Sequence, residues 1–328
     1  MTNYYRNVGL LAVCVVASVC ASAQILWKEP QSPSISAWTW GPGGEETAPR
    51  PPFRFVKERL SGTNPKVEVR DAAGRVWSVK FGSEVHSDTF APRLVSALGY
   101  AAEPTFFVHT GSISDVHHLK RAKYFIAKDG SFHGASFKLH QRGAGRDANK
   151  GAWSWVDNPF VGSRELGGLK ILIMLASNWD TKDARDGEGS NNKIIHPSRA
   201  VDSSAWFAVT DWGASFGKSG GYFERDRWDW GGYRAQTPSF VRLAPEGSLH
   251  WGFKGKHGQD ISAGVGLEDI RWLLPYLSRI TDEELETGLA ASGASAPVAR
   301  EFTELIRERI LQLQRVAASS SRVQQAVK

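Results

Sequence analysis

The spacing of apolar residues changes partway along the chain, and this change limits the folds that the chain can adopt. In the first half, apolar and polar residues alternate in segments such as Lys66–Arg70 and Val76–Lys80, which turn-forming residues separate. In the second half the apolar residues follow helical spacing, with a nearly continuous run from Leu169 to Leu175. The sequence therefore predicts an α+β protein, with an antiparallel β-rich N-terminal lobe over residues 53–140 and an α-helical C-terminal lobe over residues 141–316.

The first residues form a pattern typical of a secretory signal peptide. A short segment carrying Arg6 is followed by an apolar run from Val8 to Cys20 and by the small residues of 21–23. The apolar run is too short to cross a bilayer comfortably, and no later segment is as long and as apolar as a membrane span. We therefore expect an exported protein, periplasmic or extracellular, that is cleaved near Ala23 and does not span the membrane.

Both cysteines of the chain, Cys14 and Cys20, lie inside this removable segment. The exported chain would contain no thiol, which excludes a disulfide framework, a cysteine-bound zinc ion and a cysteine nucleophile. Residues 24–52 are rich in Pro, Gly and Ser, and we expect them to form an arm whose tryptophans pack onto the domain. Residues 317–328 are expected to form a polar tail.

The charge balance favours anionic partners without selecting one. The chain has 40 Lys and Arg against 34 Asp and Glu, which gives a formal charge of +6. A mildly basic surface suits phosphorylated ligands or an anionic envelope surface. The basic residues are not clustered with aromatic residues, and a signal peptide argues against nucleic acid as a partner, so no nucleic-acid binding is expected.

Two apolar runs in the second half each end in an aspartate. Asp180 follows the helical run, Asp211 follows Trp206–Val209, and Asn191 and Asn192 lie between them. Carboxylate and amide oxygens are hard ligands of the kind that hold Mg²⁺ together with substrate phosphates. Taken alone, each aspartate is explained more simply by a turn or a helix cap. The interpretation therefore depends on what precedes them.

Lys80 lies before these residues in the chain, at the end of a predicted strand. Lys80 ends the third predicted strand, where a single lysine is ordinarily a solvated side chain. A helix follows, with Asp88 near its start. Pro92 does not fit a helix interior, so the helix should either begin near Phe90 or be distorted there.

The order of these residues resembles that of a known superfamily. Along the chain stand a strand lysine, an acid on the next helix, a buried helix, an aspartate, an asparagine pair and the sequence Asp211-Trp212-Gly213. This order resembles the protein-kinase-like superfamily, particularly its atypical branches: the phosphatidylinositol-kinase-like, HipA-type and secreted kinase-like proteins. The resemblance extends from Phe53 to Leu313 as the order and spacing of short motifs. It implies a two-lobed kinase-like fold and phosphoryl transfer, which requires positioning and charge neutralisation.

The resemblance also implies a role for each residue. Lys80 would pair with the α- and β-phosphates of ATP or another phosphorylated nucleotide, and Asp88, with Glu84 as the second choice, would hold Lys80. Asp180 would accept or orient the attacking hydroxyl, and Lys182 would neutralise the γ-phosphate. The implied ligands of Mg²⁺ or Mn²⁺ are Asn191 or Asn192, together with Asp211.

The chain departs from the family pattern in three places, one of which is that Asn178-Trp179, and not His-Arg, precedes Asp180. The glycine-rich phosphate loop is missing, and the segment that holds Gly62 and Lys66 is at most an atypical version of it. The asparagine expected five residues after Asp180 arrives only as Asn191, eleven residues on. Residues 184–190 would therefore have to form an insertion that bulges out and returns.

These departures keep a second class of function open. The chain could be a non-catalytic pseudokinase, or it could bind glycans or another cell-envelope component through the Gly- and Trp-rich region from Tyr222 to Trp251. The sequence does not identify the phosphate acceptor.

Overall fold

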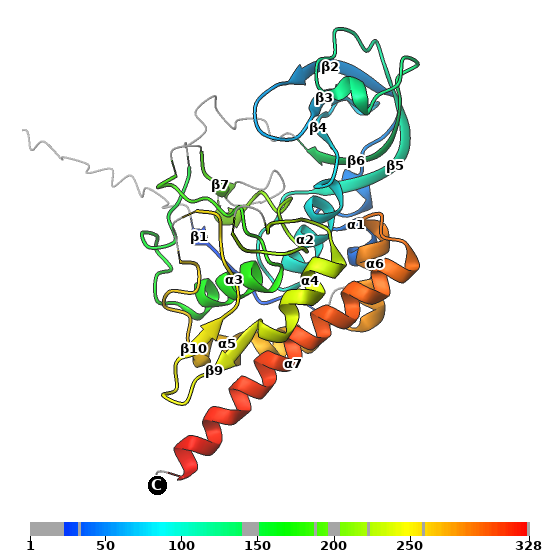
Figure 1. Ribbon diagram of the computed structural model, residues 1–328. Helices are drawn as coiled ribbons and strands as arrows, with labels where there is room; N and C mark the ends of the chain where they lie inside the picture. The colour runs from blue at the N-terminus through cyan, green and yellow to red at the C-terminus, as the bar shows by residue number, and fades with distance from the viewer. Residues whose placement is uncertain are drawn as a thin grey trace, which may run out of the picture.

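The computed structural model describes residues 23–31, 34–139, 151–186, 189–195, 204–221, 224–257 and 260–326, with side chains as far as residue 319. Residues 1–22 of the predicted signal peptide, Tyr222 and residues 140–150 at the expected boundary of the lobes lie outside the described residues. Figure 1 shows a small β-barrel above a larger, mainly helical body. Each part has its own apolar core.

The N-terminal lobe is a closed five-stranded barrel. Alternating apolar residues line its inside, including Val67, Val69, Trp77 and Val79, which are fully buried. Neighbouring strands pair antiparallel, except that β2 and β5 close the barrel as a short parallel pair. In barrel order the strands are β2 (Phe53–Arg59), β3 (Lys66–Arg70), β4 (Val76–Phe81), β6 (Ser131–Leu139) and β5 (Thr105–Ser114).

Helix α2 (Val85–Ala97) joins β4 to β5 and packs against β5 and β6. Gly82 adopts a φ of 97°, which lets the chain turn sharply from β4 toward the helix. The helix begins at Val85 and contains Pro92, so a start near Phe90 was wrong and the proline lies inside the helix. Asp88 consequently lies in the first turn, directly after the end of β4.

The arm before β2 is integrated into both lobes. Strand β1 (Gln24–Ile25) pairs parallel with β8 (Ala205–Val209), which pairs antiparallel with β7 (Asn192–Ile195). Helix α1 (Ile35–Trp40) contacts α6, and its Trp38 is buried. The arm also includes a 3-10 turn, η1 (Glu45–Thr47).

Helix α3 (Arg164–Leu175) is the buried centre of the C-terminal lobe. Its N-terminus is capped by the Ser163 hydroxyl, which accepts a hydrogen bond from the Leu166 backbone N–H at 3.2 Å. Gly167 and Gly168 let α5 approach closely, since a Cβ at Gly168 would lie 2.6 Å from the Trp272 ring. The other helices of this lobe are α4 (Trp230–Gln236), α5 (Leu267–Leu277), α6 (Asp282–Ala291) and α7 (Ala296–Ala326).

Local signals explain several elements and fail for others. Thr281 and Glu284 form a capping box at the start of α6, as their spacing predicts. The residues of Tyr124–Ile126 suggest a strand, but they instead follow and overlap a 3-10 turn, η2 (Ala122–Tyr124). Helix α7 continues to Ala326, into the segment expected to be a tail. The Gly- and Trp-rich region holds α4, the 3-10 turn η3 (Thr237–Ser239), and the hairpin of β9 (Val241–Leu243) and β10 (Leu249–Trp251).

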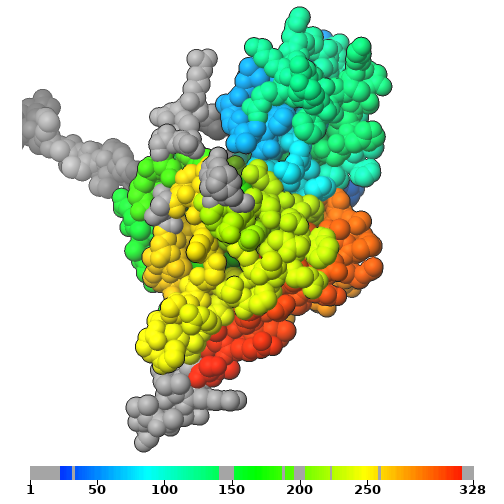
Figure 2. Space-filling model, in the orientation of Figure 1, coloured from blue at the N-terminus to red at the C-terminus, as the bar shows by residue number. Residues whose placement is uncertain are grey.

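The predicted fold class is confirmed. The protein is α+β, with a β-rich N-terminal lobe and a helical C-terminal lobe. The space-filling view in Figure 2 shows the N-terminal lobe resting on yellow-green segments of the C-terminal lobe. Among the described residues, none of the helices combines the length and the apolar character needed to cross a bilayer.

Candidate functional site

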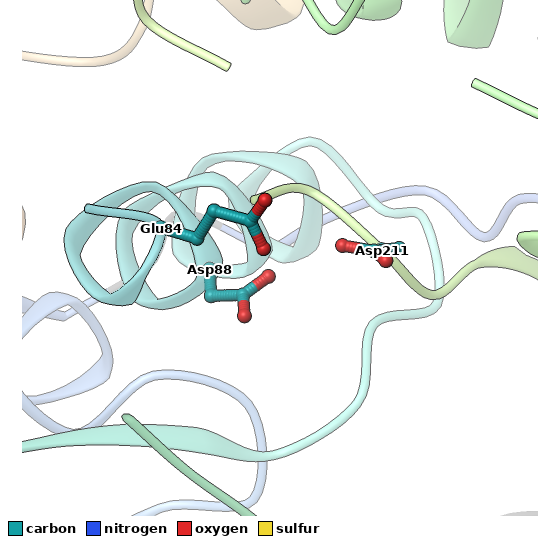
Figure 3. A group of neighbouring side chains, drawn as sticks. All are labelled: Glu84, Asp88 and Asp211. Atoms are coloured by element: carbon teal, nitrogen blue, oxygen red, sulfur yellow. The ribbon is translucent and has the colours of Figure 1, made fainter. Parts of the chain in front are cut away.

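Lys80 lies at the centre of a cluster of three carboxylates. Its Nζ is 2.5 Å from Oδ2 of Asp88, 3.0 Å from Oε2 of Glu84 and 3.7 Å from Oδ1 of Asp211. Glu84 and Asp88 share one face at the start of α2 because they are four residues apart. Figure 3 shows their carboxylates pointing toward Asp211, which comes from the chain just after β8. The cluster therefore joins the two lobes.

The charges in this cluster stabilise one another. Burial opposes a charge on Lys80, but Asp211, Asp88 and Glu84 outweigh it and hold the pKa of Lys80 well above its ordinary value. Lys80 is in turn the main reason that the pKa of Asp211 lies far below its ordinary value, although burial opposes the shift. The Asp211 side chain is 45% exposed, so water screens part of this attraction. Burial raises the pKa of Asp88, against the effect of Lys80.

Two further lysines face the same carboxylates. Lys66 on β3 lies opposite Lys80 on β4, and burial, followed by the like charge of Lys80, lowers the pKa of Lys66. Lys138 on β6 lies 3.3 Å from Glu103 and donates to the backbone carbonyl of Thr210, the residue before Asp211. No motif in the sequence singles out Lys138, and its position on an alternating strand is the only local signal for it.

The loop between β2 and β3 holds Gly62, which adopts a φ of 78°. Arg121 fixes this loop by donating to the carbonyls of Gly62, at 2.8 Å, and Leu60, at 3.1 Å. The Lys66 ammonium lies beside Gly62, 3.2 Å from where a Cβ of that residue would be. The structure thus places Gly62 and Lys66 next to each other at the edge of the cluster.

The loop after α3 brings Asp180 close to the Asp211 segment. The side-chain amide of Asn178 donates to the backbone carbonyl of Asp211 at 3.0 Å. Trp179 donates its backbone N–H to Ala214 at 3.2 Å and its indole N–H to the carbonyl of Asp226 at 2.7 Å. These bonds connect the residues before Asp180 to the chain that follows Asp211.

Two lysines and a histidine lie around the Asp180 carboxylate. Its Oδ1 lies 3.0 Å from Nε2 of His257 and 3.2 Å from Nζ of Lys256, and its Oδ2 lies 4.0 Å from Nζ of Lys182. Lys182 was expected there from the sequence. Lys256 and His257 were not, because they come from a distant segment without a recognisable motif.

The insertion after Lys182 bulges out and returns. The Asn191 backbone N–H donates to the carbonyl of Lys182 at 2.9 Å, and the Asn191 side-chain amide donates to the carbonyl of Asp180 at 2.9 Å. The Thr210 N–H in turn donates to the carbonyl of Asn191 at 2.8 Å. Asn191 is therefore bonded both to the Asp180 loop and to the residue that precedes Asp211.

Asn192 has a different environment. Its side chain is buried, and neither its amide nitrogen nor its amide oxygen has a hydrogen-bond partner among the described residues. A buried polar group without a partner is rare, and a water molecule or an ion is its usual complement. The structure thus separates the two asparagines: the Asn191 side chain is anchored through its nitrogen, and the Asn192 side chain has no hydrogen-bond partner among the described residues.

The carboxylates of the cluster fit a divalent cation. Glu84, Asp88 and Asp211 each offer an oxygen within 4.8 Å of the others. Asp88 Oδ1 is buried without a hydrogen-bond partner among the described residues. Oxygen donors of this kind suit Mg²⁺ and Mn²⁺. Arg227 forms an ion pair with the other oxygen of Glu84, so this carboxylate is shared with the segment after Asp211.

A cavity of about 450 Å³ lies elsewhere on the protein. Its lining is mainly apolar, with Tyr100, Leu139, Ile195 and Trp206 among its residues, and it includes none of the carboxylates or lysines described above. Chemistry, more than cavity volume, identifies the site.

Comparisons with known proteins give a distant structural likeness. No protein-family model matches the sequence, and no curated protein matches it significantly. Among solved structures, the chain is similar to the Golgi casein kinase, with a TM-score of 0.35 and 11% identity over 83% of this chain and 75% of that chain. The Golgi casein kinase with Mn/ADP bound gives a TM-score of 0.34 and 11% identity over 81% and 74%. Neither likeness decides the function, which is inferred below from the residues of this chain.

Proposed function

We propose that this protein binds a phosphorylated nucleotide, such as ATP, together with Mg²⁺ or Mn²⁺, and transfers a phosphoryl group to a hydroxyl acceptor. The observation that carries the proposal is the meeting of Lys80 and Asp211 across the two lobes, at 3.7 Å. The two residues come from different lobes. Their convergence is what a site for phosphate and metal requires.

Lys80 is the proposed partner of the nucleotide phosphates. Glu84 and Asp88 fix its ammonium, so a phosphate can approach without the lysine having to be ordered first. Lys66 and Lys138 add positive charge beside it. Gly62 and Lys66 are the proposed edge of the phosphate subsite, in place of a glycine-rich loop.

Asp211 and an asparagine are the proposed metal ligands. Asn191 is the better candidate of the pair because its nitrogen is bound to Asp180, which leaves its oxygen Oδ1 as the group for a cation. Glu84 and Asp88 supply further carboxylate oxygens nearby. When bound, the ion would neutralise charge on the phosphates.

Asp180 is the proposed acceptor of the hydroxyl proton, or the residue that orients the hydroxyl. His257 and Lys256 occupy its Oδ1, so Oδ2 is the oxygen left for the acceptor. Lys182, on the Oδ2 side, is placed to approach a γ-phosphate. If the chain is exported as proposed, the acceptor belongs to the periplasm or the exterior, where an envelope component or another exported protein can serve.

A thermal-shift titration tests the binding step. The mature protein should melt at a higher temperature with millimolar ATP and Mn²⁺ or Mg²⁺, because a ligand that binds only the folded state stabilises it. Asp211→Ala should lose this shift, and the control Asp115→Ala, at an exposed position away from the cluster, should keep it. No shift in the wild-type protein would contradict nucleotide binding.

Transfer is tested separately with labelled ATP. Asp180→Ala should retain the thermal shift and lose transfer, whereas transfer that survives this substitution would sink the assigned role of Asp180. Nucleotide binding without any transfer would identify the protein as a pseudokinase. Quenching of the exposed Trp230 by oligosaccharides, without a nucleotide response, would instead support a glycan-binding protein of the envelope.

A further inference from the structure

The Gly- and Trp-rich region returns to the Asp180 loop after a long excursion. The backbone N–H of Lys256 donates to the carbonyl of Trp179 at 2.7 Å, and that of Lys254 donates to the Ser219 hydroxyl at 3.3 Å. Lys256 therefore holds this segment beside the Asp180 loop, and Lys254 anchors it to Ser219. This contact delivers two side chains to Asp180 that the kinase-like motifs do not include.

His257 lies between two carboxylates. Its Nε2 is 3.0 Å from Oδ1 of Asp180, and its Nδ1 is 3.4 Å from Oδ1 of Asp186. The His257 side chain is only 14% exposed, and Asp186 is similarly shielded at 13%. An imidazole that faces an acceptor at each nitrogen cannot rotate or flip without losing one of the two contacts.

Asp186 belongs to the insertion that separates Asp180 from Asn191. Its second oxygen, Oδ2, accepts the backbone N–H of Asp183 at 2.7 Å, which fixes the carboxylate within the insertion. The insertion therefore does more than lengthen the loop: it presents a carboxylate to the far side of His257. Asp186, His257 and Asp180 form a chain of contacts from the insertion to the proposed catalytic carboxylate.

We propose that His257 and Asp186 are positioning residues for Asp180, an inference that rests on the proposed function. His257 holds Oδ1 of Asp180 and Asp186 holds His257, so that Oδ2 stays turned toward the acceptor hydroxyl. Lys256 faces the same Oδ1 at 3.2 Å and reinforces this orientation. Correct orientation of a catalytic group is worth orders of magnitude in rate.

The chemical step leaves His257 unchanged. The acceptor oxygen forms a bond to the γ-phosphorus, the bond from that phosphorus to the bridging oxygen breaks, and its electron pair leaves with the nucleoside diphosphate. The hydroxyl proton passes to Oδ2 of Asp180. His257 and Asp186 act only through the orientation of that carboxylate, so their loss should affect turnover and not nucleotide binding.

Kinetics on the full mature chain test this inference. His257→Ala should lower kcat by about 100-fold, the scale expected when a catalytic group is displaced by about 1 Å. The KM for ATP should not change, because Lys80 and Asp211 are untouched. His257→Gln, which keeps one N–H donor toward Asp180, should restore part of the rate, and Asp186→Asn should lower kcat less than His257→Ala. His250→Ala, at a half-exposed histidine on β10, is the matched control and should leave both constants unchanged.

A double variant separates positioning from a general structural role. In an Asp180→Asn background, His257→Ala should cause no further loss of transfer, because its effect passes through Asp180. An equal loss in both backgrounds, or a wild-type kcat in His257→Ala, would overturn the inference.

The free energies of unfolding of the wild type, Asp180→Asn, His257→Ala and the double variant, measured without ligand, give a readout that does not need activity. The two substitutions should change the free energy of unfolding in a non-additive way, because Asp180 and His257 are in contact. Additive changes would contradict this contact. A wild-type protein that shows no transfer would overturn the proposed function itself, while the coupling still decides whether His257 holds Asp180.

Discussion

Asn191 donates its side-chain amide to the backbone carbonyl of Asp180 at 2.9 Å, although eleven residues separate the two. The intervening insertion closes on itself, since the Asn191 N–H also returns to the carbonyl of Lys182. A spacing that departs from the family pattern therefore still yields a short, fixed connection between the aspartate and the asparagine. The adjacent Asn192 has no such connection, and this difference can be measured.

Asn191→Ala should weaken Mn²⁺ binding, measured by calorimetry in the presence of a non-hydrolysable ATP analogue, by about 10-fold or more. The reason is the loss of both the proposed ligand oxygen and the anchor to Asp180. Asn192→Ala is the matched comparison and should leave the affinity for Mn²⁺ unchanged. The reverse result, with Asn192→Ala weakening binding and Asn191→Ala neutral, would assign the ligand to Asn192.

Lys80→Met should destabilise the protein by about 3–5 kcal/mol in urea unfolding, because it leaves buried carboxylates without their counter-charge. Asp88→Asn in the same chain should recover part of this loss, since Asp88 is the nearest partner of the ammonium. Lys57→Met, at a lysine that is 59% exposed, is the control and should change stability by less than about 0.5 kcal/mol. Equal losses of stability in Lys80→Met and Lys57→Met would show that the ion pairs of the cluster do not stabilise the fold.

The lowered pKa of Asp183 predicts that the folded protein loses stability in acid. Burial opposes its charge, but hydrogen bonds from Arg185 and from the backbone N–H of Trp155 outweigh it and hold the pKa of Asp183 below its ordinary value of 3.8. A group whose folded pKa is lowered contributes stability that is present above the unfolded pKa and is lost as the pH falls through the folded pKa.

Asp183→Asn should therefore be less stable than the wild type by about 3 kcal/mol at about pH 6, with the gap narrowing in acid below about pH 4. Urea unfolding at a series of pH values measures this gap. Asp157→Asn, at an exposed position in the neighbouring segment, is the control, and its difference in stability from the wild type should not change with pH. A gap for Asp183→Asn that stays constant into acid would contradict the assignment.

Gly168→Ala should destabilise the protein by about 2 kcal/mol. This loss is expected even though alanine is more favourable than glycine inside a helix by about 1 kcal/mol. The added Cβ would lie 2.4 Å from the hydroxyl of Tyr100 and 2.6 Å from the ring of Trp272. Gly231→Ala in α4 is the comparison, because a Cβ there meets only a carboxylate oxygen of Asp229, at 3.3 Å. In thermal unfolding, Gly168→Ala should have a lower melting temperature than the wild type, and Gly231→Ala should melt near the wild-type temperature.

Local patterns in the sequence predict much of the fold. Alternation in Lys66–Arg70 and Val76–Lys80 reflects the inside and outside of a barrel, so the strands could be assigned from their own residues. The caps at Ser163 and Thr281 are likewise local. The short apolar stretch at Tyr124–Ile126 misled because a few apolar residues fit a strand and a turn equally well.

The candidate site is less predictable because its contacts join distant segments. The order of Lys80, Asp180 and Asp211 along the chain predicts that they work together, and Lys80 does lie close to Asp211. Nothing in the residues around Lys256 and His257 indicates that they return to Asp180, since that contact depends on the path of the chain between α4 and α5. Only the three-dimensional arrangement reveals them.

The parallel pairing of β1 with β8 has a consequence for the time course of folding. Gln24 and Ile25 pair with Ala205 and Trp206, so the first described strand finds its neighbour only after more than half of the chain exists. Contacts between such distant segments form slowly, because a long loop must close first. The strand that leads into Asp211 therefore gains its second neighbour late, and a chain interrupted before Ala205 would leave β1 without its partner.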